Sequence, residues 1–514
     1  MTATLPLAPR AAAHLGRWHA LVVSQIAAFM ALLDVSIVNV ALPSIQRDLN
    51  AAPATAQWVV SGYALSFGLA LIPAGRLGDS LGRRRLFLIG LAAFVLTSAL
   101  SGMAPTTGLL IAARLLQGVA GGILIPQNSG LVQELFQGAE RARAFGILGA
   151  TVGLATATGP VAGGLILTAF TGPHAWRWVF YVNVPIGLIA LLLARRFVPA
   201  VDTAGPRRVH LDVVGALLLG GGVLGVLLPV VSAESGGVGQ LGWLFVVAML
   251  LLTAFAWWEA RTARRGREPL LPPGLFRVPG FTPGSVIGGV YFIGFTGVWL
   301  VLALFFQHGL GYTPLRSGLA VTPFALGMAA AAAIAGRLVP RLGRWLTVIG
   351  LATTVMGLVT TALLLAHATG TATAWTVAAP LLAAGFGGGM VTSPNLTLTL
   401  QHVPVAMAGA AGGALQTAQR IGAAAGSAVL VTIFYNQLSQ ADAVYPTAIS
   451  HTLLYAAGFM VLALSLAIVD LARQGQRSGH QAPYRSATSG DVTVMIDGKL
   501  VERPDEPSTP SAVQ

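Results

Sequence analysis

The sequence lacks cysteine entirely and has few charged residues. Asp, Glu, Lys and Arg make up 9% of the 514 residues, whereas soluble domains usually carry about 25%. Without cysteine, disulfide bonds and thiolate metal sites are excluded. The sequence shows no metal-ligand cluster, no nucleophile motif and no G-x-x-x-x-G-K-[ST] motif. We therefore expect no enzyme activity, no cofactor and no metal, in a chain that mostly does not face water.

Long apolar runs account for most of the chain, which is 55% hydrophobic. A transmembrane helix needs about 20 mainly apolar residues. The first run, from about Trp18 to Leu42, is too long for a cleaved signal peptide, so we expect it to be retained as a span. These runs predict an all-α polytopic membrane protein. Its fourteen predicted spans are residues 19–42, 57–77, 86–104, 107–128, 143–168, 178–196, 213–233, 240–260, 283–307, 316–337, 345–366, 373–395, 408–435 and 451–472.

Arginines gather on one set of loops between these spans. Cytoplasmic loops of membrane proteins carry an excess of Arg and Lys, so this set faces the cytoplasm and both termini are predicted to be cytoplasmic. The same bias explains the formal charge of +13 without a nucleic-acid partner. The arginines are Arg83, Arg84, Arg85, Arg141, Arg143, Arg195, Arg196, Arg207, Arg208, Arg261, Arg264, Arg265, Arg267, Arg341 and Arg344.

Two short segments repeat across the chain. "GRLGDSLGR" (75–83) and "GRLVPRLGR" (336–344) agree at six of nine positions, and Gly159 to Gly163 resembles Gly422 to Gly426. Both pairs map spans one to six onto spans nine to fourteen, as expected for two six-helix halves around a central site. The predicted parts are an N-terminus (1–18), a first half (19–196), two inserted helices (197–265), a second half (266–472) and a disordered tail (473–514) with a hairpin signal at Asp497-Gly498.

The first apolar run contains a carboxylate, Asp34, which costs about 2.5–3.5 kcal/mol near the centre of a bilayer on insertion scales. Span one runs outward and span four inward, so Asp34 and Arg114 both lie roughly 10–12 Å below the outer edge. We therefore expect an ion pair that leaves a proton-binding carboxylate when it opens. A static buried pair remains an alternative. Asn39, in the same run, favours a hydrogen bond between helices over a ligand contact.

Five motifs together resemble those of the major facilitator superfamily, and in particular its fourteen-span drug/proton antiporter branch, the EmrB/QacA-type exporters. The resemblance covers about residues 18 to 472 and implies the major facilitator fold. Pro340 departs from it, because the second copy of the loop signature usually has an acidic residue there. The motifs are "GRLGDSLGRRRLF" (75–87), "RLLQGVAGG" (114–122), "GLATATGPVAGG" (153–164), "LLDVSIVNVALPSI" (32–45) and "WRWVFYVNVPIG" (176–187).

The loop motif has a physical interpretation as a gate. Gly75 and Gly82 permit a tight reversal, and Asp79 can accept bonds from Arg83 or from a nearby helix N-terminus. For Arg84 and Arg85, a simple membrane anchor is an equal alternative.

The span-five motif predicts a local break and a close approach of helices. Gly159 and Pro160 are expected to break the helical ladder, and Gly163 and Gly164 to let a neighbouring backbone approach closely. Close packing alone is an alternative, whereas the resemblance implies a role in exchange and in sealing against a leak.

The resemblance and the depth argument together predict a proton-coupled antiporter that exports small amphipathic drugs or antibiotics. It would work by alternating access in the bacterial plasma membrane, as a monomer driven by the proton gradient. A proton-coupled symporter of a small solute and a non-transporting membrane sensor remain alternatives. For Arg420, the alternatives are an anionic group of the substrate or backbone carbonyls across the bundle. Candidate residues of the substrate cavity are Trp58, Asn39, Gln307, Asn395, Gln416 and Arg420.

Overall fold

The computed structural model describes residues 8–170, 172–199, 212–231, 240–267, 269–367, 370, 372–439, 444–480, 493–496 and 499–502. It divides into two units, residues 1–471 and 472–514. In the second unit, strands β1 (Thr493–Ile496) and β2 (Lys499–Glu502) pair antiparallel, with Ile496 opposite Lys499, on either side of the predicted hairpin turn. That turn itself, Asp497-Gly498, lies outside the described residues.

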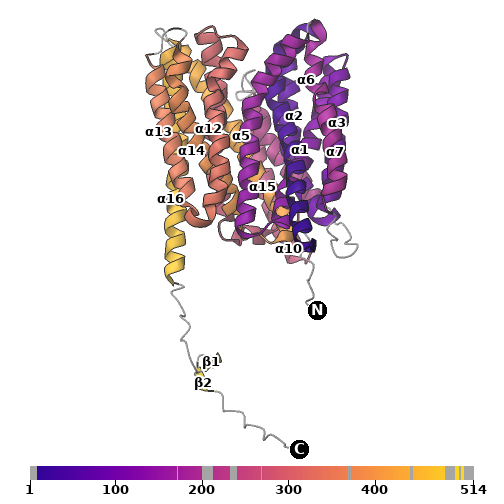
Figure 1. Cartoon of the computed structure of the whole chain (residues 1–514), viewed down its shortest axis with the longest axis vertical. Coiled ribbons are helices and arrows are strands. Elements are labelled where there is room, and N and C mark those ends of the chain that lie inside the picture. The colour runs from indigo at the N-terminus through magenta and orange to yellow at the C-terminus, as the bar shows by residue number, and fades with distance from the viewer. Residues whose placement is uncertain are drawn as a thin grey trace, which may run out of the picture. The chain divides into compact units, whose positions relative to one another are not determined.

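The first unit is a bundle of long helices in two groups that lie side by side (Figure 1). Over the described residues, every predicted span falls on helical structure, and the sixth is divided at Val182 into α6 and α7. The first group is α1 (Ala8–Asp48), α2 (Pro53–Leu81), α3 (Arg83–Met103), α4 (Thr107–Leu135), α5 (Gly138–Ala169), α6 (Trp178–Tyr181) and α7 (Asn183–Phe197). The second is α11 (Phe281–Leu304), α12 (Pro314–Leu342), α13 (Trp345–Leu365), α14 (Thr373–Leu400), α15 (Ala408–Leu438) and α16 (Tyr445–His480).

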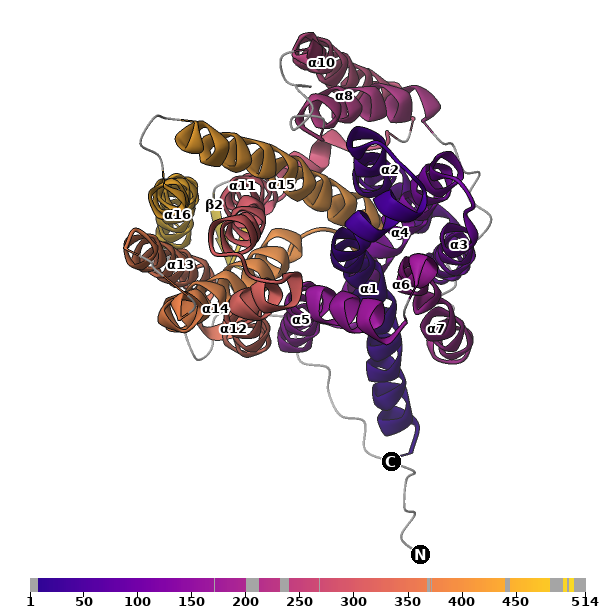
Figure 2. The same ribbon diagram turned by 90° about the horizontal axis from the view of Figure 1, so that it is seen from above.

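The two inserted helices, α8 (Val213–Val231) and α10 (Trp243–Arg264), lie outside these groups (Figure 2). α8 packs against α2, α15 and α10. Among the described residues, twelve helices are long and apolar enough to cross a membrane, and α5 and α8 are not in that set. The count of fourteen spans therefore stays a prediction. The last helix continues to His480, beyond the predicted end of its span at residue 472.

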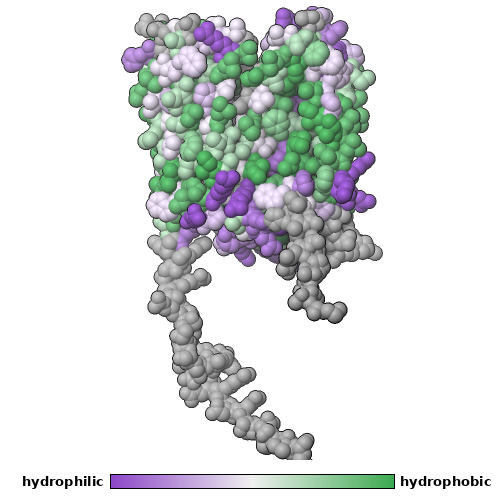
Figure 3. Space-filling view, viewed as in Figure 1, coloured by the Kyte–Doolittle hydropathy of each residue, from purple (hydrophilic) through white to green (hydrophobic). Residues whose placement is uncertain are grey.

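Large apolar side chains cover the outer faces of the helices. Leu96, Leu192, Met249 and Met356 are among those exposed, and Figure 3 shows the broad apolar belt to which such residues contribute. Only helices and closed barrels satisfy every backbone hydrogen bond inside a bilayer, which explains why such apolar runs fold as helices. The first unit is all-α, and the protein is a multi-pass integral membrane protein.

The two groups meet at two helix crossings that the internal repeat relates to each other. At one, the α2–α15 seam, Gly75 lies so close to the backbone of Gly409 that neither position has room for a side chain. At the other, the α5–α12 seam, a Cβ on Gly336 would lie 2.8 Å from the Cα of Gly146. Residues 75 and 336 occupy the same place in the two sequence copies. The repeat therefore places glycine on both sides of both seams.

Candidate functional site

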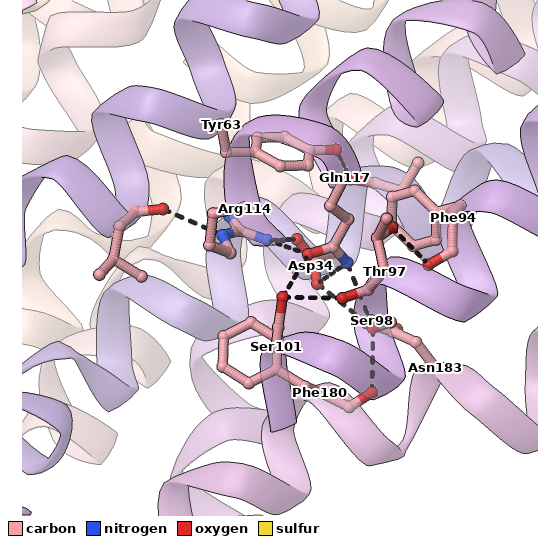
Figure 4. Close-up of polar contacts among 12 residues, drawn as sticks. Asp34, Tyr63, Phe94, Thr97, Ser98, Ser101, Arg114, Gln117, Phe180 and Asn183 are labelled. Carbon is pink, nitrogen blue, oxygen red and sulfur yellow. Dashed lines mark hydrogen bonds and ion pairs between the residues drawn. The ribbon is translucent and has the colours of Figure 1, made fainter. Parts of the chain in front are cut away.

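Asp34 is fully buried in the middle of the first group of helices. Three side chains donate hydrogen bonds to its carboxylate, and all of them come from that group (Figure 4). Arg114 of α4 donates to Oδ2, while Gln117 of α4 and Asn183 of α7 donate to Oδ1 at 3.1 and 2.9 Å. Asp34 and Arg114, which were paired from the sequence by their depth, are thus in direct contact, and a cage of three donors surrounds the carboxylate.

Arg114 is also fully buried and has partners of its own. Its Nε donates to the carbonyl of Val59 at 3.0 Å, and its NH1 donates to Gln117 Oε1 at 2.8 Å. The ring of Tyr63 lies 4.2 Å from its Cζ, in a cation–π contact. One nitrogen, NH2, is buried without a hydrogen-bond partner. A second ring, that of Phe180, lies 5.6 Å from Cζ, so one carboxylate, one amide, one carbonyl and two rings hold the guanidinium.

Sequence reasoning missed four members of this site. Gln117 and Asn183 lie in motifs that were quoted, but neither received a role, although a polar residue in an apolar span is itself a signal. Ser98 of α3 accepts from both, at 3.2 and 3.0 Å. Tyr63 of α2 donates its hydroxyl to the carbonyl of Ala31 at 3.2 Å. Nothing in the spacing of Ser98 or Tyr63 along the sequence predicts that they surround the partners of Asp34.

The glycines of the span-five motif pack on α1, close to Asp34. A Cβ on Gly159 would collide with Ser36, and one on Gly163 would lie 3.2 Å from Ile37. One on Gly164 would lie 3.5 Å from Leu315 of α12. These glycines join α5 to α1 on one side and to α12 of the second group on the other.

The predicted break at Gly159 and Pro160 is wrong, because α5 is one continuous helix from Gly138 to Ala169. A proline removes only one backbone donor, and neighbouring helices can hold such a helix together in a membrane protein. The side chain of Pro160 lies outside the described residues.

The loop motif joins the two groups at one end of the bundle. Asp79 is buried and accepts from Arg83 at 2.9 Å, and from the backbone nitrogens of Gly409 and Ala410 at 2.9 and 3.0 Å. Those two nitrogens open α15, where the helix dipole favours a carboxylate. Both of the partners suggested for Asp79 are thus present together.

Arg83 binds on both sides of the same seam. It donates to Gly130 O at 2.7 Å and to Glu134 at 3.2 Å in its own group, and to Val405 O in the other. Gly82 has a φ of 93°, which favours glycine at the reversal between α2 and α3. Arg84 donates instead to the carbonyl of Arg195 within the first group, so it does not cross the seam.

We call the contact of Asp79 with Arg83, Gly409 and Ala410 the latch. The second copy of the loop does not form an equivalent contact among the described residues. Pro340 stands where Asp79 stands in the first copy, so it has no carboxylate to offer to another helix. Arg344, the counterpart of Arg83, donates to Asp470 at 2.8 Å and to Asn395 at 2.7 Å, all within the second group. Asn395 is 2% exposed and also donates to Gly284 O. Asn395 is therefore a structural partner of Arg344, and its assignment to a substrate cavity stays a prediction.

The other predicted cavity residues are spread over the bundle. Asn39 is exposed, and Gln307 lies in a π-helical turn, Phe305–Gly309, that follows α11. Trp58 packs against the core of the first group. Gln416 and Arg420 are both partly exposed on α15. Only this last pair lies on one helix within a few residues of the seam.

Among the described residues, the hydrogen bonds between the two groups gather at the end that carries Asp79. Besides Asp79 and Arg83, Arg141 of α5 donates to Gln401 O at 3.5 Å there. At the opposite end the surface is hollowed between the two groups (Figure 3). The structure is therefore closed at one end and open at the other, as expected of one state in an alternating cycle. Among the described residues, no cluster of His, Cys, Asp or Glu could hold a metal ion.

Comparison with known proteins identifies relatives over most of the chain. The model of the Major Facilitator Superfamily matches residues 26–427. The puromycin resistance protein pur8 of Streptomyces alboniger is 39% identical over 81% of this chain and 82% of its own. The cephamycin export protein CmcT of Amycolatopsis lactamdurans is 37% identical over 80% of this chain and 84% of its own. A crystal structure of the human organic anion transporter MFSD10 covers 88% of this chain and 99% of its own, with a TM-score of 0.63 and 16% identity, which bears on the fold alone.

Proposed function

Because this chain belongs to the Major Facilitator Superfamily, a family of membrane transporters, we propose that it is a proton-coupled antiporter that exports small amphipathic drugs or antibiotics from the cytoplasm. Relatives named for puromycin resistance and cephamycin export support the export of antibiotics. The observation that supports proton coupling is the buried Asp34–Arg114 pair. A carboxylate deep in the bilayer is energetically costly, so such residues are rare and usually have a function.

The orientation follows from the arginine-rich loops. The Asp79 end carries Arg83 to Arg85, Arg141 and Arg143, so it is the cytoplasmic end under the positive-inside rule. The hollow between the halves then opens to the outside, and the structure represents the outward-facing state. In this state the Asp79 latch is closed, and it must open before substrate can enter from the cytoplasm.

Asp34 acts within one half and not across the two. Protonation of its carboxylate removes the charge that Arg114, Gln117 and Asn183 bind. The cage then loses its three charge-assisted bonds, and α1 is no longer held against α4 and α7. Since α1 packs on α5 at Gly159 and Gly163, a shift of α1 reaches the α5–α12 seam. Substrate supplies the other half of the exchange through its different affinities for the two states.

Purified protein in proteoliposomes tests this proposal. The probes are ethidium, 1-pyrenebutyrate and 1-pyrenebutanol, which are cationic, anionic and neutral. Together they cover the three possible charges of the substrate. An antiporter accumulates a probe on the acidic side of an imposed pH difference, a symporter accumulates it on the alkaline side, and a sensor accumulates none.

Asp34→Asn should abolish accumulation and retain binding of the probe. The matched control is Asp48→Asn at the end of the same helix, where Asp48 only accepts from Trp176 and contacts His174. Asp48→Asn should accumulate probe like the wild type. Accumulation by Asp34→Asn at the wild-type rate would show that another group carries the proton.

A further inference from the structure

Arg420 is the one charged residue of α15, and it lies far from both ends of the helix. It follows Ala408 by twelve residues, which places it about 18 Å along the axis from the latched end. A cation at such depth is costly unless it is paired. Like Asp34, Arg420 is therefore a charged residue deep in a membrane-spanning helix, but it belongs to the second half of the protein.

The contacts of Arg420 leave its charge without an anion. Among the described residues it has no ion pair, and its Cζ lies 4.5 Å from the centre of the Phe67 ring of α2. A guanidinium has five N–H donors in a planar fork, and a ring face satisfies none of them as a hydrogen-bond acceptor would. The side chain is also partly exposed. Its donors remain available to a molecule that enters between the halves.

Arg420 lies on the α2–α15 seam, beyond the point where the two backbones touch. Near the latch the two backbones touch, at Gly75 and Gly409, and a Cβ on Gly413 would lie 2.6 Å from Leu71 O. Further along the same crossing, the contact is made by the long side chain of Arg420 on the ring of Phe67. The guanidinium thus lies beyond the close backbone contacts of the seam, against the ring of Phe67.

The charges around this point add to a positive site. Tyr63 and Phe67 of α2 stack with ring centres 5.9 Å apart. Arg114 lies over Tyr63, and Arg420 lies over Phe67. Asp34 neutralises Arg114, but nothing among the described residues neutralises Arg420. The middle of the seam therefore attracts anions.

We infer that Arg420 binds the ionised acidic group of the transported molecule, and that the substrates are amphipathic organic anions that carry a carboxylate. The planar fork of an arginine matches a carboxylate in a bidentate pair, and Phe67 offers an apolar face beside it. The inference rests on the proposed transport function, to which it adds the substrate class.

Equilibrium dialysis without any pH gradient tests the inference. The protein is placed in lipid nanodiscs, and empty nanodiscs serve as the blank. The probes are 1-pyrenebutyrate and 1-pyrenebutanol, which share the pyrene ring and differ in the charged group. Wild-type protein should bind the carboxylate at least about tenfold more tightly than the alcohol. Equal affinities would overturn the inference.

Variants of Arg420 test whether this residue causes the preference for the carboxylate probe. Arg420→Gln should bind both probes alike, whereas Arg420→Lys should keep a reduced preference, since an ammonium has the charge without the fork. The matched control is Arg341→Gln, which removes one exposed positive charge and should keep the full preference. If Arg420→Gln does not fold, the lysine variant decides, and unchanged affinity for the carboxylate in that variant would overturn the inference.

The binding preference measured by dialysis and the accumulation measured in proteoliposomes can fail separately. A carboxylate preference that depends on Arg420, in a protein that never accumulates any probe, would remove the proposed function and leave this site. Accumulation driven by a pH difference, with no preference for the carboxylate, would remove this site and leave the proposed function.

Discussion

Replacing Asp79 with asparagine should release the latch between the two halves. The carboxylate is buried and binds three donors, two of which open α15 in the other half. Asparagine has nearly the same size but no charge, and its amide nitrogen is a donor that cannot bind those donors. The closed end should therefore open more often, while each half keeps its own packing.

The expected size follows from these bonds. A hydrogen bond to a charged group contributes about 1.5–3 kcal/mol. If the substitution costs the closed state the equivalent of one such bond, the ratio of open to closed protein rises about 10- to 150-fold. Screening by solvent does not reduce this figure, because the side chain of Asp79 is 1% exposed.

Labelling of one introduced cysteine measures the opening. The natural chain has no cysteine, so there is no background reaction. Ser129 of α4 is fully buried beneath α15, where its Cβ lies 3.2 Å from the position of a Cβ on Gly412. A maleimide reaches Ser129→Cys only when α15 moves away. Asp79→Asn should therefore speed labelling by about 10- to 150-fold, provided that the end opens and closes faster than it reacts.

Glu134→Gln is the matched control. Glu134 belongs to the same cluster and pairs with Arg83 at 3.2 Å, but within the first half. Its substitution removes one carboxylate without touching α15, so labelling should stay close to the rate of the Ser129→Cys parent. Equal acceleration by both variants would mean that the charge of the cluster matters and not the bond across the seam. No acceleration by Asp79→Asn would refute the latch.

Three further outcomes are expected. Gly409→Ala should also speed labelling of Ser129→Cys, because a Cβ there collides with Gly75, and a rate equal to that of the parent would contradict the seam. Arg114→Ala should abolish accumulation of probe in proteoliposomes while the protein still inserts, and breaking a buried pair should lower its stability by about 3–5 kcal/mol, visible as a lower Tm; normal accumulation would argue against the pairing. Reporter fusions after Arg267 and after Ala472 should both read cytoplasmic, and an external signal from either would contradict the orientation.

The sequence predicted the helices well because each needs only local information. An apolar run of sufficient length folds as a helix in a bilayer whatever surrounds it. The pairing of Asp34 with Arg114 was also within reach, since depth along two antiparallel helices follows from counting residues. For Asp79, the sequence suggested Arg83 or a helix N-terminus as the partner, and in the structure Asp79 binds both.

The remaining parts of the site depend on which helix faces which. Counting residues gives the depth of Asn395 but not its direction, and the structure turns it toward Arg344. Gln117 and Asn183 were visible as polar residues in apolar spans, but only three-dimensional packing brings both onto the same carboxylate oxygen. The break predicted at Gly159 and Pro160 failed for the same reason, because the neighbours of a helix decide whether it bends.

The position of α8 means that a molecule dissolved in the bilayer reaches the α2–α15 seam less easily than the α5–α12 seam. α8 packs against both α2 and α15, with Leu227 against Gly68, and Figure 2 shows it, with α10, on the outer side of this pair. A lipid-soluble compound that diffuses sideways toward the α2–α15 seam meets a further helix before it reaches Arg420. The α5–α12 seam lies away from α8 and α10 in the same view. Lateral entry from the membrane, where it occurs, is thus directed to one flank of the protein, opposite the inserted helices.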